Sequence, residues 1–182
     1  MIYVTSDTHF CHNREFLYGP RGFLSVDEMN AQLIHNWNSI VTFEDDVYLL
    51  GDLMLNNDEE GARCIKQLNG HLHIAIGNHD TDNRIELYRS FYNVVEVQFG
   101  YRLKYNGCHF LLTHYPTITS NFDYDKPMKA RLFNLCGHSH TPDRFADWDK
   151  GGIYHTELDA HNNCPVSLDE VVTDIRSKFC SP

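Results

Sequence analysis

The chain has 182 residues, of which 42% are hydrophobic and 22% charged, and its formal net charge is −10 at pH 7. This length predicts one domain over residues 1–182, and the composition excludes a disordered or fibrous protein. The acidic balance disfavours nucleic acid as a partner, because phosphate backbones are bound mainly through Lys and Arg, although cations held by carboxylates would add positive charge locally.

The first half of the chain alternates buried strands with helices. Short apolar runs predict strands at residues 2–5 (IYVT), 46–50 (DVYLL) and 71–76 (HLHIAI). Between the first two, Ser25 and Glu28 have capping-box spacing, and apolar residues recur at helical intervals up to Trp37. A second helix is predicted over residues 58–68. This alternation predicts an α/β fold with parallel strands joined by crossovers.

The pattern changes in the second half. Three short strands are predicted at residues 94–98 (VVEVQ), 101–105 (YRLKY) and 108–113 (CHFLLT), separated only by Phe99-Gly100 and Asn106-Gly107. Asn-Gly is a strong hairpin signal, so these strands are expected to pair antiparallel. Two more strands are expected in the segments 131–136 and 152–158. A closing helix is predicted over residues 167–179, with a second capping pair at Ser167 and Glu170.

Nothing in the sequence indicates export or membrane insertion. No run reaches the roughly 20 apolar residues of a membrane helix, and the N-terminus lacks a basic region followed by an apolar one. The six cysteines form no CxxC pair, so they are expected to be reduced and mostly buried. We therefore expect a soluble, cytoplasmic protein, and the sequence leaves its oligomeric state open.

Polar residues gather where the predicted strands end. The endings are Asp7-Thr8-His9, Gly51-Asp52, Gly77-Asn78-His79-Asp80, His114 and Gly137-His138-Ser139-His140. Any one of these, GNHD included, is equally well explained as a solvated turn. Five together require a compensating partner, because unpaired carboxylates and imidazoles are costly to bury. A pair of divalent cations fits, since these oxygen and nitrogen ligands suit first-row metals such as Mn, Fe or Zn.

The ordered series DTH, GD, GNHD, H and GHSH resembles the calcineurin-like metallophosphoesterase superfamily, over residues 7–140. The resemblance implies a four-layer α/β/β/α sandwich, with two mixed sheets flanked by helices and a metal site at the carboxyl ends of the strands. It implies one metal held by Asp7, His9, Asp52 and His140, and a second held by Asp52, Asn78, His114 and His138. It also implies that His79 protonates the leaving group or steadies the phosphoryl oxygens, with Asp80 as its orienting partner.

The activity implied is hydrolysis of a phosphate ester by in-line attack of a metal-bridging hydroxide, with Mn expected and Fe, Zn, Ni and Co as alternatives. A phosphodiester is favoured. Phosphomonoesterase, nucleotide pyrophosphohydrolase and nuclease are not separated by the sequence. The alternative from another functional class is a metal-binding interaction scaffold without catalysis. The intact set of ligand positions argues against it.

Substrate contacts are expected in the loop after the first ligand pair, at His12, Arg14 and Arg21. The segments 10–24 and 115–130 are the candidates for pocket walls, and such short segments suit an open site for a small phosphorylated substrate or nucleotide. Further histidines are expected to be structural, at His35, His71, His73 and His109, whereas His155, Asp159 and His161 are weaker candidates for the pocket rim.

Overall fold

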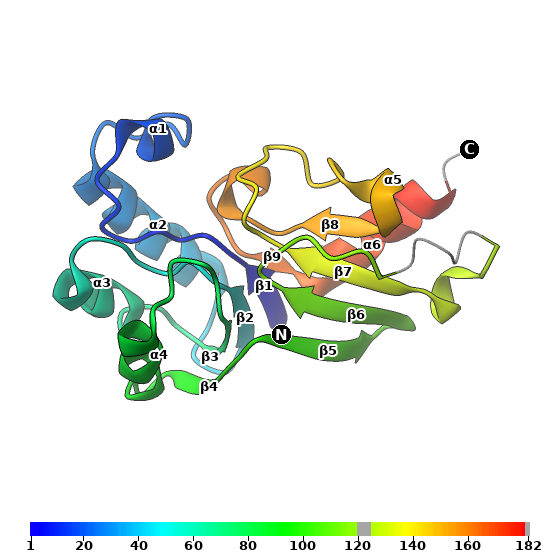
Figure 1. The fold of residues 1–182 in the computed structure, drawn as a ribbon, viewed down its shortest axis with the longest axis horizontal. Coiled ribbons are helices and arrows are strands. Elements are labelled where there is room, and N and C mark those ends of the chain that lie inside the picture. The colour runs from blue at the N-terminus through cyan, green and yellow to red at the C-terminus, as the bar shows by residue number, and fades with distance from the viewer. Residues whose placement is uncertain (120–124, 181–182) are drawn as a thin grey trace.

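The computed structural model describes residues 1–119 and 125–180, and it is an α/β protein with two mixed sheets flanked by helices (Figure 1). The first sheet has the order β4-β3-β2-β1-β9. Its strands are β1 (Ile2–Thr5), β2 (Asp46–Leu50), β3 (His71–Ala75), β4 (Val94–Gln98) and β9 (Val166–Ser167). Strands β1 to β4 run parallel, and β9 pairs antiparallel with β1.

The second sheet has the order β5-β6-β7-β8. Its strands are β5 (Gly100–Tyr105), β6 (Cys108–Thr113), β7 (Leu132–Cys136) and β8 (Ile153–His155). The Asn106-Gly107 turn joins β5 and β6 in the predicted antiparallel hairpin, with both residues at positive φ. Strands β6, β7 and β8 are parallel, so the carboxyl ends of β6 and β7 point toward the same edge.

One strand pairing differs from the prediction. Strand β4 pairs parallel with β3 at the edge of the first sheet and does not join the hairpin. The chain passes to the second sheet at Phe99-Gly100. A two-residue link looks like a hairpin turn in sequence, yet here β4 and β5 belong to different sheets.

The helices are α1 (Glu15–Tyr18), α2 (Val26–Ile40), α3 (Asp58–Ile65), α4 (Asp82–Arg89), α5 (Trp148–Gly151) and α6 (Leu168–Cys180). The side chain of Ser25 caps α2 by accepting from the Glu28 N–H at 3.2 Å, as predicted, and Glu28 in turn accepts from Leu24 N–H at 2.7 Å. Helix α3 ends at Ile65, three residues before its predicted end, and β8 covers only part of the predicted 152–158 strand. In the described ranges, no helix has the length and apolarity needed to cross a membrane.

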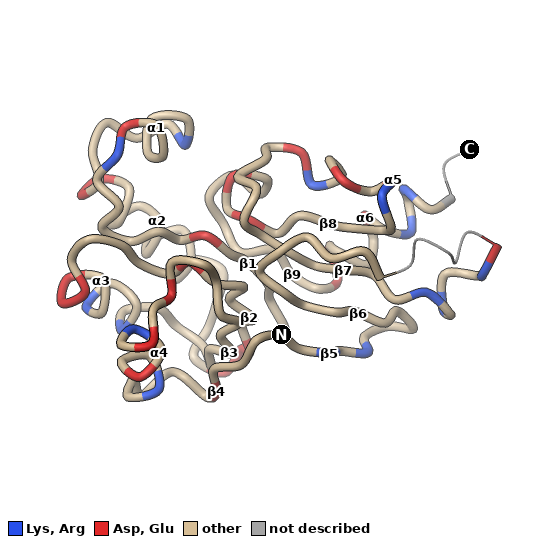
Figure 2. The backbone as a smooth tube through the Cα atoms, viewed as in Figure 1, with Lys and Arg blue, Asp and Glu red and all other residues tan. Residues whose placement is uncertain are grey.

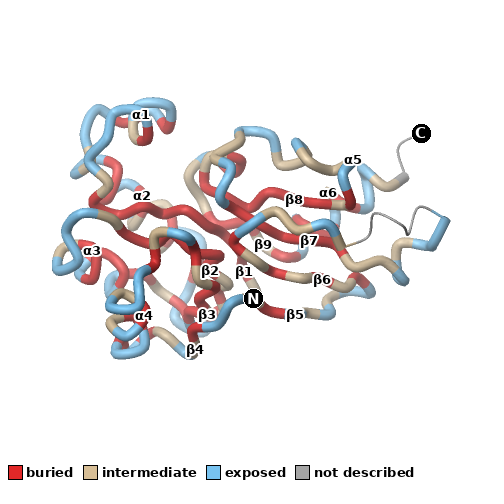
Figure 3. Tube along the Cα trace, viewed as in Figure 1, coloured by how far each residue is buried: buried red, intermediate tan, exposed pale blue. Residues whose placement is uncertain are grey.

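Both faces of the first sheet are buried (Figure 3). One cluster, with Trp37 of α2 and Leu49 of β2, lies between this sheet and helices α2 to α4. The other joins Val4 of β1 to Phe110 and Phe133 of the second sheet and to residues of α6. Parallel strands covered on both faces read as continuous apolar runs, which is why β1 and β2 were recognisable in the sequence. Of the cysteines whose side chains are described, all are free and most are buried, as expected.

Candidate metal centre

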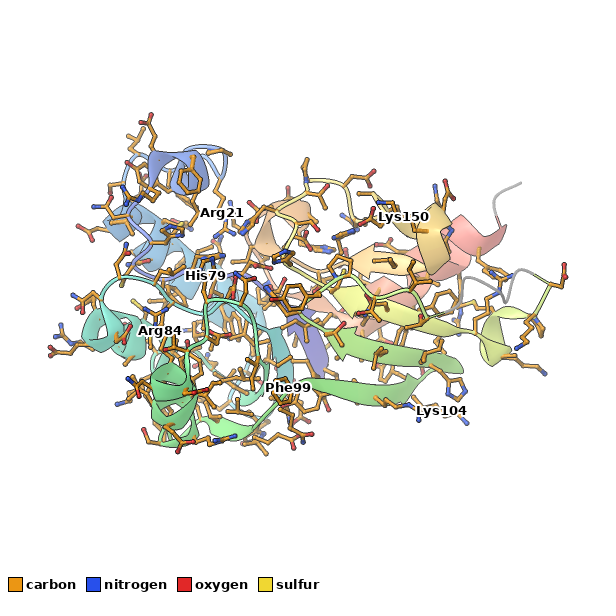
Figure 4. The ribbon with its side chains drawn as sticks, in the orientation of Figure 1. Arg21, His79, Arg84, Phe99, Lys104 and Lys150 are labelled. Carbon is orange, nitrogen blue, oxygen red and sulfur yellow. The ribbon has the colours of Figure 1, made fainter. Side chains whose placement is uncertain are left out.

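The seven predicted ligands meet at the edge where the two sheets come together. They follow β1, β2 and β3 of the first sheet and β6 and β7 of the second. Figure 4 labels His79 in the left part of the view, below Arg21 and above Arg84. The topology therefore converts five separated polar strand ends into one cluster.

Asp7, His9 and His140 form the first part of this cluster. The Asp7 Oδ1 atom lies 3.6 Å from His9 Nε2 and 3.7 Å from His140 Nε2, and the two Nε2 atoms are 3.1 Å apart. Asp7 Oδ1 is buried and has no hydrogen-bond partner. An unpartnered buried carboxylate oxygen is costly, and one that faces two imidazole nitrogens fits a divalent cation.

Asp52, Asn78, His114 and His138 form the second part. Asp52 Oδ2 lies 3.5 Å from His114 Nε2 and 3.7 Å from His9 Nε2, so this oxygen faces both halves of the cluster. Asn78 Oδ1 is 2.9 Å from His114 Nε2 and 2.9 Å from His138 Nδ1. Asp7, Asp52 and His114 form a second group whose ligand atoms are close enough to hold an ion.

Two histidines are oriented by acceptors on their other ring nitrogen. His114 Nδ1 donates to the carbonyl of Leu50 at 2.8 Å, and His140 Nδ1 donates to Asp159 Oδ2 at 3.1 Å. Because a carbonyl or carboxylate only accepts, each contact fixes the proton on Nδ1 and leaves the Nε2 lone pair facing the cluster. This is the arrangement that metal-ligating histidines generally adopt.

The surroundings of the cluster keep the Asp7 side chain ionised. Burial opposes ionisation of Asp7, but the nearby imidazoles of His9, His140 and His114 outweigh it and lower the Asp7 pKa to about 2. Burial raises the pKa of Asp52 and lowers the pKa of His9. Burial also opposes protonation of His140, yet the Asp159 carboxylate raises its pKa. A cation would compensate the carboxylates of both aspartates.

The backbone at the cluster is in an unusual conformation. Five predicted ligands have left-handed φ values, namely Asp7 (59°), His9 (47°), Asp52 (55°), His138 (74°) and His140 (50°). Residues other than glycine seldom adopt this region, and such conformations cluster at functional sites because surrounding contacts must hold them. Here the contacts include Asp7 N–H to Gly51 O at 3.1 Å and His9 N–H to Asp52 O at 3.0 Å.

Gly77 of the GNHD turn permits the close approach of two loops. A Cβ atom at this position would lie 2.3 Å from Asp52 Oδ1 and 2.6 Å from Asp52 N. The next residues use this proximity, since His79 N–H donates to Asp52 Oδ1 at 2.8 Å. The glycine therefore allows the third strand end to pack against the second.

His79 lies on the cavity, but Asp80 does not orient its ring as predicted. The His79 side chain is 42% exposed, with Nε2 3.9 Å from Asp52 Oδ2. Asp80 is buried and accepts from Asp52 N–H (2.9 Å), Gly77 N–H (2.8 Å) and the Tyr88 hydroxyl (2.9 Å). Among the described contacts, none joins the Asp80 carboxylate to the His79 ring. Asp80 thus ties two ligand loops together.

A cavity of about 510 Å³ opens over the cluster and is lined by His9, His12, Phe16, Leu17, Pro20, Asp52, Asn78, His79, His138, His140 and Asp159. Of the three predicted substrate contacts, only His12 lines it. Arg14 is exposed outside the lining. The 10–24 segment forms a wall, as expected, whereas no described residue of the 115–130 segment does; residues 120–124 of that segment lie outside the described ranges.

Arg21 and Asp159 form a pair behind the cluster. The Arg21 side chain is only 1% exposed; it donates to Asp159 Oδ2 at 2.7 Å and to the Asp7 carbonyl at 2.8 Å. Arg21 does not line the cavity over the cluster, and its contacts support the site. The sequence predicts Asp159 only as a weaker candidate for the pocket rim, yet its carboxylate contacts His140. No spacing signal marks this contact, because Asp159 follows β8 and meets His140 only in the fold. His155 and His161, by contrast, are buried away from the cavity.

Two known proteins are similar to this chain in sequence. No family model matches the chain. The uncharacterized protein MJ1445 of Methanocaldococcus jannaschii is 34% identical over 176 residues, covering 94% of this chain and 89% of that protein. The gene 66 protein of Mycobacterium phage L5 is 26% identical over 191 residues, covering 93% and 91%.

Two solved structures are similar. The protein of unknown function AQ665 from Aquifex aeolicus has a TM-score of 0.71 at 25% identity, covering 95% of this chain and 98% of that one. A novel archaeal phosphodiesterase has a TM-score of 0.50 at 16% identity, covering 85% and 81%, a likeness of fold alone. The identity to the M. jannaschii protein extends over nearly the whole of both chains, and this chain belongs to the family of MJ1445.

Proposed function

We propose that this chain is a metal-dependent phosphoesterase that hydrolyses a small phosphodiester. The observation that carries the proposal is the unpartnered, buried Asp7 Oδ1 atom, which faces the Nε2 atoms of His9 and His140. A structural polar cluster would satisfy this oxygen with a protein donor, whereas a metal site leaves it for the ion.

Two ions are proposed, with Mn as the first choice and Fe, Zn, Ni or Co as alternatives. Asp7, His9 and His140 would hold one, and Asn78, His114 and His138 the other, with Asp52 shared. When bound, such ions neutralise phosphate oxygens and lower the pKa of coordinated water. Asp52 suits the shared position because its Oδ2 atom lies between His9 and His114.

His79 is the proposed general acid. Its ring is on the cavity, half-exposed, and close to Asp52, and imidazole exchanges protons near neutral pH. The backbone N–H of His79 is held by Asp52 Oδ1, so the ring is positioned relative to the proposed metal site. His79 would donate a proton to the leaving oxygen of the ester.

The fold supports the proposal without deciding the substrate. We propose that residues 1–182 form one domain of the calcineurin-like sandwich type. The fold is similar to that of an archaeal phosphodiesterase, and this likeness supports the proposal of a phosphoesterase activity. Phosphomonoester and nucleotide pyrophosphate hydrolysis use the same groups, so substrate comparison must separate them.

The test is hydrolysis of bis-p-nitrophenyl phosphate and p-nitrophenyl phosphate by protein stripped of metal and reloaded with Mn. We expect metal-dependent turnover, faster with the diester, and its loss in Asp52→Ala and His79→Ala. His71→Ala is the control, because His71 is exposed at the amino end of β3, opposite the cluster. Mn binding with no turnover of either ester would favour the interaction scaffold, and failure to bind any tested divalent metal would refute the proposal.

A further inference from the structure

The cavity over the proposed metal site has an apolar wall made by one short segment. Its apolar lining residues are Phe16, Leu17 and Pro20, all within or next to α1. The remaining lining residues are histidines, aspartates and an asparagine. The cavity therefore combines a cluster suited to phosphate with a surface suited to an apolar group.

Phe16 is the aromatic part of this wall and is exposed. It is 73% exposed, whereas its neighbour Leu17 is buried in the core. The His12 ring packs edge-on against Phe16, with centroids 5.7 Å apart and planes at 88°. A large aromatic side chain left uncovered at a cavity mouth offers a stacking surface, because ligand contact would remove its apolar area from water.

The wall is held firmly against the site. Arg21, which follows the wall segment (residues 16–20), donates to Asp159 and to the Asp7 carbonyl, so the end of the segment is tied to two residues of the cluster region. The segment is also tied to its flanks, because Tyr18 N–H donates to Arg14 O at 3.2 Å and Phe23 N–H to Tyr18 O at 3.0 Å. A surface held in advance loses little conformational entropy when a ligand contacts it.

The cavity carries no cation of its own among the residues that the structure describes, since neither Lys nor Arg lines it. Figure 2 shows Lys and Arg on either side of α1, on α3 and α4, and toward the far end of the second sheet. A polyphosphate or a long nucleic acid would bring several phosphates beyond the one at the metal cluster, and the lining has no side chain to neutralise them.

From this combination we infer that the 16–20 segment selects the substrate: one ester group of the phosphodiester carries a planar ring, as an aryl or a nucleoside ester does, and this ring stacks on Phe16. The inference rests on the proposed function and names its substrate class.

Binding of two small phosphonates to the Mn-loaded protein tests this assignment. Phenylphosphonate and methylphosphonate share the charged group and differ in the planar one. We expect the wild type to bind phenylphosphonate about tenfold more tightly, the effect of one good aromatic contact. The ratio should fall to about twofold or less in Phe16→Ala and be kept in Phe16→Tyr, which retains an aromatic ring.

Phe43→Ala is the matched control, because Phe43 is also 70% exposed but lies outside the cavity lining. It should keep the wild-type ratio. Two results would overturn the role of Phe16 and leave the phosphoesterase proposal standing. One is equal binding of the two phosphonates by the wild type, and the other is a preference for phenylphosphonate that survives in Phe16→Ala. Binding of neither probe to Mn-loaded protein would overturn the phosphoesterase proposal and the inference with it.

Discussion

Replacing Asp159 by Asn tests whether the contact behind His140 supports a metal ligand. Asp159 accepts from His140 Nδ1 (3.1 Å), Arg21 Nε (3.1 Å) and Arg21 Nη2 (2.7 Å). Burial raises the Asp159 pKa, but His140 and Arg21 lower it well below its usual range, so the side chain is a carboxylate at neutral pH. Asn removes the charge. If its amide oxygen accepts from His140, its NH₂ group faces Arg21, so two donors then face each other.

The magnitude follows from these contacts. Loss of a carboxylate behind a ligating histidine generally weakens metal binding by about 10- to 100-fold, because the imidazole becomes less basic and less well oriented. Arg21 loses its ion-pair partner but keeps the carbonyls of Asp7 and Thr8, so we expect a loss of stability near the lower end of the roughly 3–5 kcal/mol typical of broken buried pairs.

Calorimetric titration of metal-free protein with Mn measures the first effect, and urea unfolding without metal measures the second. Asp147→Asn is the control, since Asp147 faces another histidine, His155, at 3.2 Å, away from the cavity. It should leave Mn affinity unchanged. Wild-type affinity for Mn in Asp159→Asn would refute the reasoning that Asp159 orients His140 for a metal.

Three further predictions concern stability. Gly77→Ala should cost about 3 kcal/mol in urea unfolding, because the added Cβ would lie 2.3 Å from Asp52 Oδ1 and 2.6 Å from its backbone nitrogen. Tyr88→Phe should cost about 2 kcal/mol, because it removes a buried donor to the Asp80 carboxylate. Burial lowers the pKa of His161 from 6.5 to about 4, so the unfolded chain binds a proton in this window that the folded chain does not. The free energy of unfolding should therefore fall by up to about 3 kcal/mol as pH drops from 6.5 to 4, measured by urea unfolding across that range.

Each of these has a matched comparison. Gly107→Ala, whose Cβ would meet nothing within 4 Å, should cost only about 1 kcal/mol for its left-handed backbone, and an equal cost at both glycines would contradict the clash argument. Tyr92→Phe removes an exposed hydroxyl contact and should be near neutral. His161→Gln should reduce the fall in stability between pH 6.5 and 4 by about the His161 share, and a fall equal to that of the wild type would assign it to other groups, such as His12.

The strand ends could be predicted because their signals are local. Residues such as Asp7 and Asp52 follow apolar runs directly, so their position along the chain places them at the same edge of the sheet. Asp159 could not be found in this way, since its contact with His140 depends on how the loop after β8 returns to the cluster.

The errors in the fold prediction have a related origin. The sequence around β4 has the spacing of a hairpin, and only the tertiary arrangement decides that β4 extends the first sheet while β5 begins the second. Helix α1 has four residues and no side-chain cap, so it lacks a periodic signal, yet it carries Phe16. Asp80 was assigned to its neighbour in sequence, whereas its hydrogen bonds reach another loop.

The wide separation of the candidate ligands along the chain has a consequence for biosynthesis. The His138 N–H donates to Asp7 Oδ2 across 131 residues, so the cluster is complete only when β7 has docked. During translation the DTH segment emerges first, and Asp52 and His114 follow it well before His138 and His140 have been made. Any stabilisation from ions that His138 or His140 helps to hold is therefore available only after β7 and the residues that follow it have been made.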